Sequence, residues 1–365
     1  MYNLMRRAVP EFAQVLMTFV DELHTPPAEL LDICVEIVQV RRVGSHVKPD
    51  RGRPDVVEEF DTPAFRAALD LTLRKWKPAV AQLEFTQMAA YAPQCAPAKT
   101  VLIEHDITID LYQQLLENRK DPELARQLER WRAFETTAWR SLDCVVIMSE
   151  KDREIVAGAR KVIALPNGVD LERFRPVSVD PDPRRLLFIG SFAHLPNLLA
   201  IDFFLRKVWP LLDEQKPVLH IIAGARHRFH YERFRDRVNF LLDAPRVEIE
   251  DFVSDVRPAY GGAGVVIAPL LASAGTNIKI MEAMAMAKAI VSTSSGVNGL
   301  DLEPGKDVII ENDPSRMAEA ILRLMQDSAY AKELGSRARR TVEQRFGWDS
   351  IAESQRRLYQ DLLKS

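Results

Sequence analysis

Hydrophobic positions along the 365-residue chain fall in short runs that alternate with stretches of helical periodicity. A short, continuously apolar run predicts a strand covered on both faces, as in parallel sheets. In the first half these runs are Cys34–Val40, Ala79–Glu84, Lys99–His105, Cys144–Ser149 and Lys161–Leu165. In the second half they are Arg185–Gly190, Val218–Gly224, Val247–Ile249, Gly264–Ala268, Ala289–Thr293 and Val308–Glu311. The alternation predicts an α/β protein with helices on both faces of parallel sheets.

The opening stretch follows a different pattern. Phe12, Val15, Leu16 and Phe19 recur at helical spacing, and no strand-like run comes before them. This spacing predicts that the chain opens with a helix.

Length and proline content predict two domains. A chain of this size exceeds the usual limit for one hydrophobic core. The segment Arg175–Arg185 contains three prolines, which are not expected inside a central strand or helix, so it is interpreted as a linker. Helical spacing resumes soon afterwards, over residues 198–212. We therefore expect domains at 1–176 and 184–347, with a last helix in 348–365 that could pack back on the first domain.

Composition narrows the function classes. Hydrophobic residues make up 47% and charged residues 28%, as in a globular enzyme, and the formal net charge of −3 argues against a nucleic-acid partner. No apolar run reaches the roughly 18 residues of a membrane span, so a cytoplasmic location with weak or absent membrane contact is expected. Cys34, Cys95 and Cys144 lack metal-type spacing and are interpreted as buried thiols in a reducing compartment. The histidines show no zinc-type spacing with cysteines or acids, so no metal site is predicted. No cofactor is expected.

The richest candidate chemistry lies in Pro269–Ile290. Here an apolar run ends in the small residues Ser273, Ala274 and Gly275, which let a ligand approach the backbone. A helix opening at Thr276 or Asn277 would direct free N–H groups and the positive end of its dipole at the loop. Such a helix start is suited to holding a phosphate.

Two charged residues strengthen this prediction. Lys279 would add a full positive charge, and Glu282, about one turn later, lies on the same side of the helix. A carboxylate there could accept hydrogen bonds from the vicinal hydroxyls of a ribose. The alternative is that the two residues form a solvated ion pair and the surrounding Ala and Met positions are ordinary core. The agreement of small loop, helix start, base and acid favours an anion-and-sugar site.

Taken in order, four motifs resemble the retaining glycosyltransferases of the GT-B type, in the family-4 group that uses nucleotide sugars. The motifs are Phe188–Asn197 (FIGSFAHLPN), Pro166–Asp170 (PNGVD), Gly275–Ala285 (GTNIKIMEAMA) and Phe346–Trp348 (FGW). The resemblance covers nearly the whole chain. It implies two Rossmann-like parallel-sheet domains that face across a cleft, with the nucleotide sugar bound mainly by the C-terminal one.

The resemblance also implies roles for particular residues. Gly190 and Ser191, and with them Gly224 after another strand, would lie beside the diphosphate. Thr276, Asn277 and Lys279 would face the phosphates and the sugar, and Glu282 would hold the ribose. His105 stands at the carboxyl end of a predicted strand, where open α/β sheets bind ligands, and would be presented to the donor sugar. The predicted catalytic residues are therefore His105, Lys279 and Glu282.

The sequence departs from the family in two places. Many members carry two glutamates separated by seven residues, and the first position is Ala274 here. The N-terminal domain also lacks the family's first strand and glycine-rich turn, because the chain opens with what is interpreted as the helix after them. Either the sheet is completed differently, or the fold tolerates the loss, or the sequence is truncated.

The expected function is retaining, metal-independent transfer of a sugar from a nucleotide-diphosphate donor to an unidentified acceptor. Two alternatives stay open. A catalytically decayed GT-B scaffold or binding protein would explain both departures, and a sugar-nucleotide epimerase of similar architecture would use the same donor. The absence of a glycine-rich loop ending in Lys-Ser or Lys-Thr argues against an ATPase of the P-loop kind.

Overall fold

The computed structural model describes residues 1–42, 52–117, 121–156, 158–177, 179–273 and 276–364. It divides the chain into two compact units, Met1–Pro166 with Trp348–Ser365, and Asn167–Gly347. The first unit therefore ends before the expected boundary at residue 176. The reason is that Val169 and Phe174 are buried in the core of the second unit, and Val169 forms a β-bridge with Gly347.

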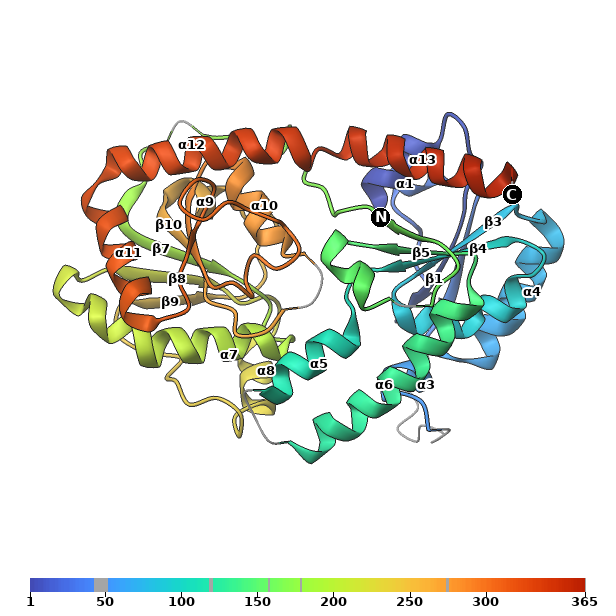
Figure 1. The fold of residues 1–365 in the computed structure, drawn as a ribbon, viewed down its shortest axis with the longest axis horizontal. Coiled ribbons are helices and arrows are strands. Elements are labelled where there is room, and N and C mark those ends of the chain that lie inside the picture. Colours follow the sequence, from blue (N-terminus) through green and yellow to red (C-terminus); the bar gives the residue numbers. More distant parts are fainter. Residues whose placement is uncertain (43–51, 118–120, 157, 178, 274–275, 365) are drawn as a thin grey trace. The chain divides into compact units, whose positions relative to one another are not determined.

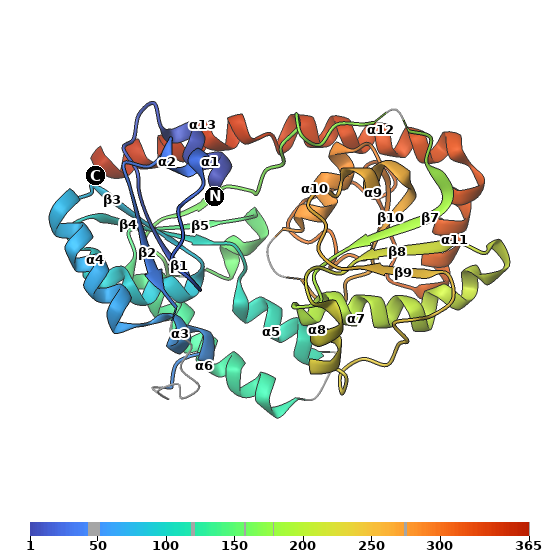
Figure 2. The same ribbon diagram turned by 180° about the vertical axis from the view of Figure 1, so that it is seen from behind.

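The first unit contains two parallel sheets, β1–β2 and β3–β4–β5–β6 (Figures 1 and 2). Its strands are β1 (Val15–Val20), β2 (Glu36–Arg41), β3 (Val80–Glu84), β4 (Lys99–Glu104), β5 (Cys144–Ile147) and β6 (Val162–Ala164). Its α-helices are α1 (Tyr2–Ala8), α2 (Ala28–Leu31), α3 (Asp55–Phe60), α4 (Pro63–Trp76), α5 (Thr108–Glu117), α6 (Pro122–Ser141) and α13 (Trp348–Lys364). The 3₁₀ helices η1 (Thr86–Cys95) and η2 (Glu150–Glu154) complete it.

Alternating side chains of the central strands bury both faces of the four-stranded sheet. On β4, Leu102 packs with Trp139 in one core, while Val101 and Ile103 pack in another with Leu358 of α13. This alternation follows from the two-residue period of a strand. The last helix is accordingly part of the first unit, where it also lies beside α1 (Figure 1).

The predicted opening helix over positions 12–19 is wrong, because residues 15–20 form strand β1. This strand pairs in parallel with β2, from Val15 opposite Glu36 to Val20 opposite Arg41. The run Val-Leu-Met-Thr-Phe-Val is rich in β-branched and aromatic residues, which favour strands, and its helical spacing was coincidental. The short helix α1 does precede it. The shortening of this domain relative to the family stays a prediction.

The second unit contains one six-stranded parallel sheet in the order β12–β11–β10–β7–β8–β9. The strands are β7 (Asp182–Ile189), β8 (Val218–Ile222), β9 (Val247–Glu250), β10 (Ala263–Ala268), β11 (Ala289–Ser292) and β12 (Ile309–Ile310). The helices are α7 (Leu195–Phe203), the π-helical η3 (Phe204–Val208), the 3₁₀ η4 (Trp209–Gln215), α8 (His227–Arg233), α9 (Arg257–Gly262), α10 (Ile278–Ala285), α11 (Pro314–Gln326) and α12 (Ser328–Arg345).

Helices cover both faces of this sheet. Leu186 and Phe188 of β7 pack on one face with α7 and α11, and Leu187 packs on the other with α9 and α10. Each strand predicted from the sequence is present in the two units, with ends shifted by a few residues. The α/β class with two parallel-sheet units is confirmed.

Proline positions explain two irregularities. Pro183 lies in β7, although the sequence predicted a linker up to Arg185. The pairing of β7 with β10 shifts register between Ala263 and Val265, beside Pro183, so the missing proline N–H interrupts no regular ladder. Pro210 begins the switch from π-helical to 3₁₀ geometry after α7, because it cannot donate to the helical hydrogen bonds.

Gly335 provides a test of the packing of α12. A Cβ atom at this position would lie 2.1 Å from the carbonyl oxygen of Ala287, a backbone atom that cannot rotate away. We predict that Gly335→Ala lowers the free energy of unfolding by about 1–3 kcal/mol, measured by urea unfolding. Gly262→Ala is the matched control, because its Cβ would meet nothing within 4 Å, and its effect should stay below about 0.5 kcal/mol. Equal effects would contradict this packing.

Candidate functional site

The candidate site lies where the strand order of the second unit changes direction. From β7 the chain adds β8 and β9 on one side, and β10, β11 and β12 on the other. The loops after β7 and β10 therefore diverge at their carboxyl ends, which is where open α/β sheets bind ligands. Gly190 and Ser191 follow β7, and Thr276, Asn277 and Lys279 follow β10.

The Lys279 ammonium group is held by neutral partners. Its Nζ donates a 2.8 Å hydrogen bond to Oδ1 of Asn197 and lies 4.9 Å from the centre of the Phe188 ring. Among the described residues it forms no ion pair. Desolvation lowers the pKa of Lys279 to about 8, and the nearby Glu282 carboxylate only partly opposes this effect. The group is thus a half-buried cation whose charge is not neutralised by a bonded acid.

Glu282 is oriented by Tyr260 of α9. The Tyr260 hydroxyl lies 3.0 Å from Oε2 of Glu282 and 3.1 Å from the carbonyl oxygen of Lys279. Partial burial raises the pKa of Glu282, while Tyr260, Arg173 and Lys279 pull it down. No hydrogen bond from the described residues reaches Oε1, so that oxygen is free to accept one from a ligand.

The start of α10 is tied to two neighbouring loops. Asn277 precedes the helix, and its Nδ2 donates to Oγ of Ser273 at 3.0 Å and to the carbonyl oxygen of Gly296 at 2.7 Å. Thr276 Oγ1 accepts from Nδ2 of Asn167 at 3.0 Å. The predicted site residue Gly275, with Ala274, lies outside the described residues. Asn277 Nδ2 therefore links the start of α10 to Ser273 and to Gly296.

Close packing explains the glycines after β7 and β8. A Cβ on Gly190 would lie 2.7 Å from Oδ1 of Asn197, and a Cβ on Gly224 would lie 2.9 Å from Oγ of Ser191. Gly224 also has a φ of +75°, which side chains rarely adopt. The structure thus brings Gly190, Ser191 and Gly224 together, and Asn197 joins them to Lys279.

In the first unit, His105 follows β4 and is held by Glu84 at the end of β3. The distance from Nε2 of His105 to Oε2 of Glu84 is 2.6 Å. Burial would raise the pKa of Glu84, but the hydrogen bond and the charge of His105 outweigh burial and lower it. Phe85, at a φ of 72°, places its ring 4.4 Å from that of His105. The imidazole is therefore fixed in orientation.

A buried carboxyl pair supports this strand end. Glu104 accepts a 2.6 Å hydrogen bond from Nε1 of Trp139, and Glu135 accepts from the backbone N–H groups of Thr108 and Ile109 at the start of α5. Burial, together with the neighbouring Glu135 carboxyl, raises the pKa of Glu104 to about 8. The pair fixes the turn between β4 and α5, in which His105 lies.

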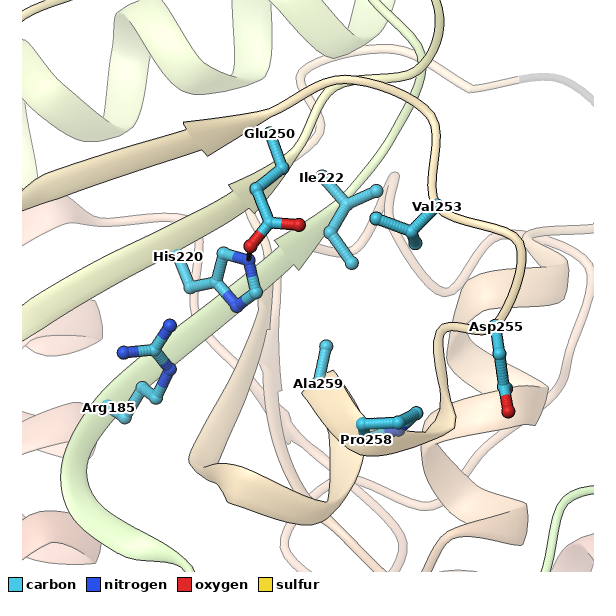
Figure 3. Close-up of a pocket in the computed structure, with 8 residues that line it drawn as sticks. All are labelled: Arg185, His220, Ile222, Glu250, Val253, Asp255, Pro258 and Ala259. Atoms are coloured by element: carbon cyan, nitrogen blue, oxygen red, sulfur yellow. Dashed lines mark hydrogen bonds and ion pairs between the residues drawn. The ribbon is translucent and has the colours of Figure 1, made fainter.

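A cavity of about 260 Å³ lies on one face of the sheet of the second unit (Figure 3). Its lining residues are Arg185, His220, Ile222, Glu250, Val253, Asp255, Pro258 and Ala259. His220 is buried and its Nε2 lies 3.0 Å from Oε1 of Glu250, whereas Nδ1 has no hydrogen-bond partner among the described residues. Desolvation lowers the pKa of His220, and the charge of Arg185 adds to the effect. The ring of His220 thus carries a buried nitrogen without a hydrogen-bond partner among the described residues.

Three residues that hold the candidate site are not among the residues predicted from the sequence. Asn197 is only the last residue of the motif Phe188–Asn197, and Tyr260 and Glu84 belong to none of the four motifs. Glu84 had a detectable signal, because it ends the strand beside that of His105, opposite Ile103. Asn197 and Tyr260 had no such signal, because their roles depend on contacts across 82 and 22 positions of the chain.

Nothing in the described ranges gathers three or more potential metal ligands. None of the described helices could cross a membrane.

Comparison with known proteins supports a sugar-transfer domain. Residues 183–327 match the family described as Glycosyl transferases group 1. The matched segment lies within the second unit. Alpha-maltose-1-phosphate synthase of Mycolicibacterium smegmatis is 25% identical over 64% of this chain and 66% of its own length. An uncharacterized 44.6 kDa protein in the cps region of Klebsiella pneumoniae is 25% identical over 51% of this chain and 49% of its own. The chain thus spans less than two thirds of these relatives.

Solved structures extend the likeness to the whole fold. A sucrose-phosphate synthase from Thermosynechococcus elongatus superposes with a TM-score of 0.76 at 18% identity, covering 100% of this chain and 92% of that one. The Anabaena protein HepE, in complex with UDP and glucose, superposes with a TM-score of 0.65 at 16% identity, covering 98% and 94%. The expected GT-B fold is confirmed by these matches.

The depressed pKa of Lys279 can be measured directly. We predict that its reaction with an amine-acylating reagent has a midpoint near pH 8, whereas an ordinary exposed lysine titrates near 10.4. Mass spectrometry after competitive labelling at several pH values gives the midpoint for each lysine. Glu282→Gln should move the midpoint of Lys279 downward, because a negative charge that favours the ammonium form is removed. A midpoint above pH 10 would contradict the described burial.

Proposed function

We propose that this protein is a retaining glycosyltransferase that takes a sugar from a nucleotide-diphosphate donor bound by the second unit. The observation that carries the proposal is the arrangement of the Lys279 ammonium group and the Glu282 carboxylate at the start of α10, inside a Glycosyl transferases group 1 domain. An unneutralised cation beside backbone N–H groups suits a diphosphate, and a free carboxylate oxygen suits a ribose diol. The first unit is proposed to hold the acceptor, which stays unidentified.

In the proposed complex the diphosphate lies against Gly190, Ser191, Gly224 and Thr276, whose small side chains let it approach the backbone. Oε1 of Glu282 accepts hydrogen bonds from the ribose hydroxyls, while Oε2 stays bonded to Tyr260. Lys279 then meets the phosphate oxygens from its place on Asn197. This assignment gives each charged group of the site one part of the ligand.

The proposed reaction breaks the bond between the sugar's anomeric carbon and the terminal phosphate oxygen. The bonding electrons go to that oxygen, and Lys279 with the N–H groups at the start of α10 stabilises the developing charge. The acceptor hydroxyl attacks from the same face of the sugar and gives its proton to the leaving phosphate, so the anomeric configuration is retained. His105 of the first unit is proposed to orient the sugar. Because Lys279 supplies the positive charge, we expect no metal requirement, and EDTA should leave the rate unchanged.

The cavity beside β8 is the proposed place of the nucleobase. Its lining includes Ile222, two positions before Gly224, and Ala259, which precedes the Tyr260 that bonds Glu282. Arg173 acts electrostatically on both Glu282 and Asp255. The carboxylate proposed to bind the ribose and the acid of the cavity therefore lie near the same side chain. The apolar side chains of Val253 and Pro258 in the cavity suit a flat ring. His220 and Asp255 are proposed as acceptors for N–H groups of the base.

The two charged residues provide the first test. Release of nucleoside diphosphate from UDP-glucose, GDP-mannose and ADP-glucose would be measured without added acceptor, and the best donor taken forward. Lys279→Ala should lower kcat by roughly 10²–10³-fold, because it removes charge stabilisation. Glu282→Gln should mainly raise KM. The exposed Lys332→Ala serves as control and should keep the wild-type rate.

The outcomes separate the alternatives. Near-normal turnover in both site variants would contradict the proposal, and so would a folded wild type that binds none of the three donors. A new sugar isomer attached to an intact nucleotide would indicate an epimerase. Binding without any turnover, even with acceptor mixtures, would indicate a decayed scaffold.

A second prediction concerns base selection. If His220 contacts the base, His220→Leu removes one hydrogen bond and should change the ratio of Kd values among UDP, GDP and ADP by about tenfold. Titration calorimetry gives the three constants, with the exposed His24→Ala as a control that keeps the wild-type ratio. An equal loss of affinity for all three nucleotides would contradict base contact at this cavity.

A further inference from the structure

Asn197 occupies an unusual position between the two loops of the candidate site. Its Nδ2 donates to the carbonyl oxygen of Ser191 at 2.9 Å, and its Oδ1 accepts from Nζ of Lys279 at 2.8 Å. One amide thus connects the loop after β7 with the helix after β10. Both of its polar atoms are used, so its orientation is fixed by hydrogen bonds of opposite sense.

The amide of Asn197 occupies space that is open only because residue 190 is a glycine. A Cβ on Gly190 would lie 2.7 Å from Oδ1 and 2.8 Å from Cγ of Asn197. The backbone N–H of Asn197 also donates to the carbonyl oxygen of His194 at 3.0 Å, which fixes the first turn of α7 beneath the side chain. The amide therefore cannot move away from Lys279 without breaking contacts on both sides.

The chemistry of the amide explains why the partner is neutral. A carboxylate at position 197 would accept the same hydrogen bond, but it would pair with the ammonium and reduce its attraction for a ligand anion. It would also place a second oxygen against the carbonyl oxygen of Ser191, where Nδ2 now donates. An amide oxygen orients the ammonium and leaves its net charge available. The Phe188 ring face on the other side is likewise uncharged.

We propose that Asn197 is a positioning residue, which acts through Lys279 by holding the ammonium group at the diphosphate loop without neutralising it. This inference rests on the proposed function for the identity of the anion. The contact with Lys279 itself is independent of that function. The titratable groups that act on or feel Lys279 are Glu282 on its own helix and His194 before α7, whose pKa is lowered by burial and by Lys279. Neither group is removed by a change at position 197.

The test is a double-mutant cycle between positions 197 and 279. Affinity for UDP, GDP and ADP is measured by titration calorimetry, and the tightest ligand is used throughout. We expect Asn197→Ala to weaken binding about tenfold in the wild-type background and to have little further effect when Lys279→Met is present. A loss of equal size in both backgrounds would overturn the proposal, because it would show that Asn197 acts independently of Lys279. The exposed Asn239→Ala is the matched control and should bind as the wild type.

A second readout needs no nucleotide. The acylation midpoint of Lys279 should fall in Asn197→Ala, which loses an acceptor for the ammonium form, and rise in Asn197→Asp, which adds a negative charge. A purely structural role for Asn197 would lower thermal stability without these opposite shifts. An unchanged midpoint in both folded variants would overturn the positioning role. If Lys279→Met leaves nucleotide affinity unchanged while the midpoints shift as expected, the proposed function fails and the positioning role stands.

Discussion

The arrangement of the second unit depends on one interaction, the retention of a positive charge at a half-buried position without an acid bonded to it. Burial makes the ammonium form of Lys279 costly and lowers its pKa to about 8. The amide dipole of Asn197 and the quadrupole of the Phe188 ring attract the ammonium group and offset part of that cost. Both groups are neutral, so the positive charge is kept. A site of this kind is stabilised further when an anion arrives, which links the geometry of the loops to ligand binding.

Small residues and strand order make this interaction geometrically possible. The loops after β7 and β10 begin side by side, because these strands are neighbours at the point where the strand order changes direction. Gly190 admits the amide of Asn197, and Gly224 admits Ser191, so backbone and side chains approach more closely than a Cβ would allow. Tyr260 then fixes Glu282 from the side of α9. The fold therefore places an acid and a base on one helix turn with separate partners.

Much of this arrangement followed from the sequence, and the exceptions have physical causes. Among the described strands, all but β1 were predictable because each forms a short apolar run. Lys279 and Glu282 were predictable because a helix places them on one side. The strand Val15–Val20 was mistaken for a helix because its apolar positions also satisfy a helical period. The boundary at Pro166 was missed because Val169 and Phe174 join the second core through tertiary contacts. Asn197 and Tyr260 were missed for the same reason, since their partners are distant in sequence.

The proposed nucleoside diphosphate site of the second unit lies between Lys279 and Glu282. A crystal structure of the protein with UDP, GDP or ADP would test it. We predict phosphate oxygens within hydrogen-bond distance of Lys279 Nζ and of the N–H groups near Thr276, with the ribose hydroxyls on Glu282. A nucleotide bound elsewhere, or bound here with Lys279 and Glu282 turned away from it, would show that these two residues do not form the donor site.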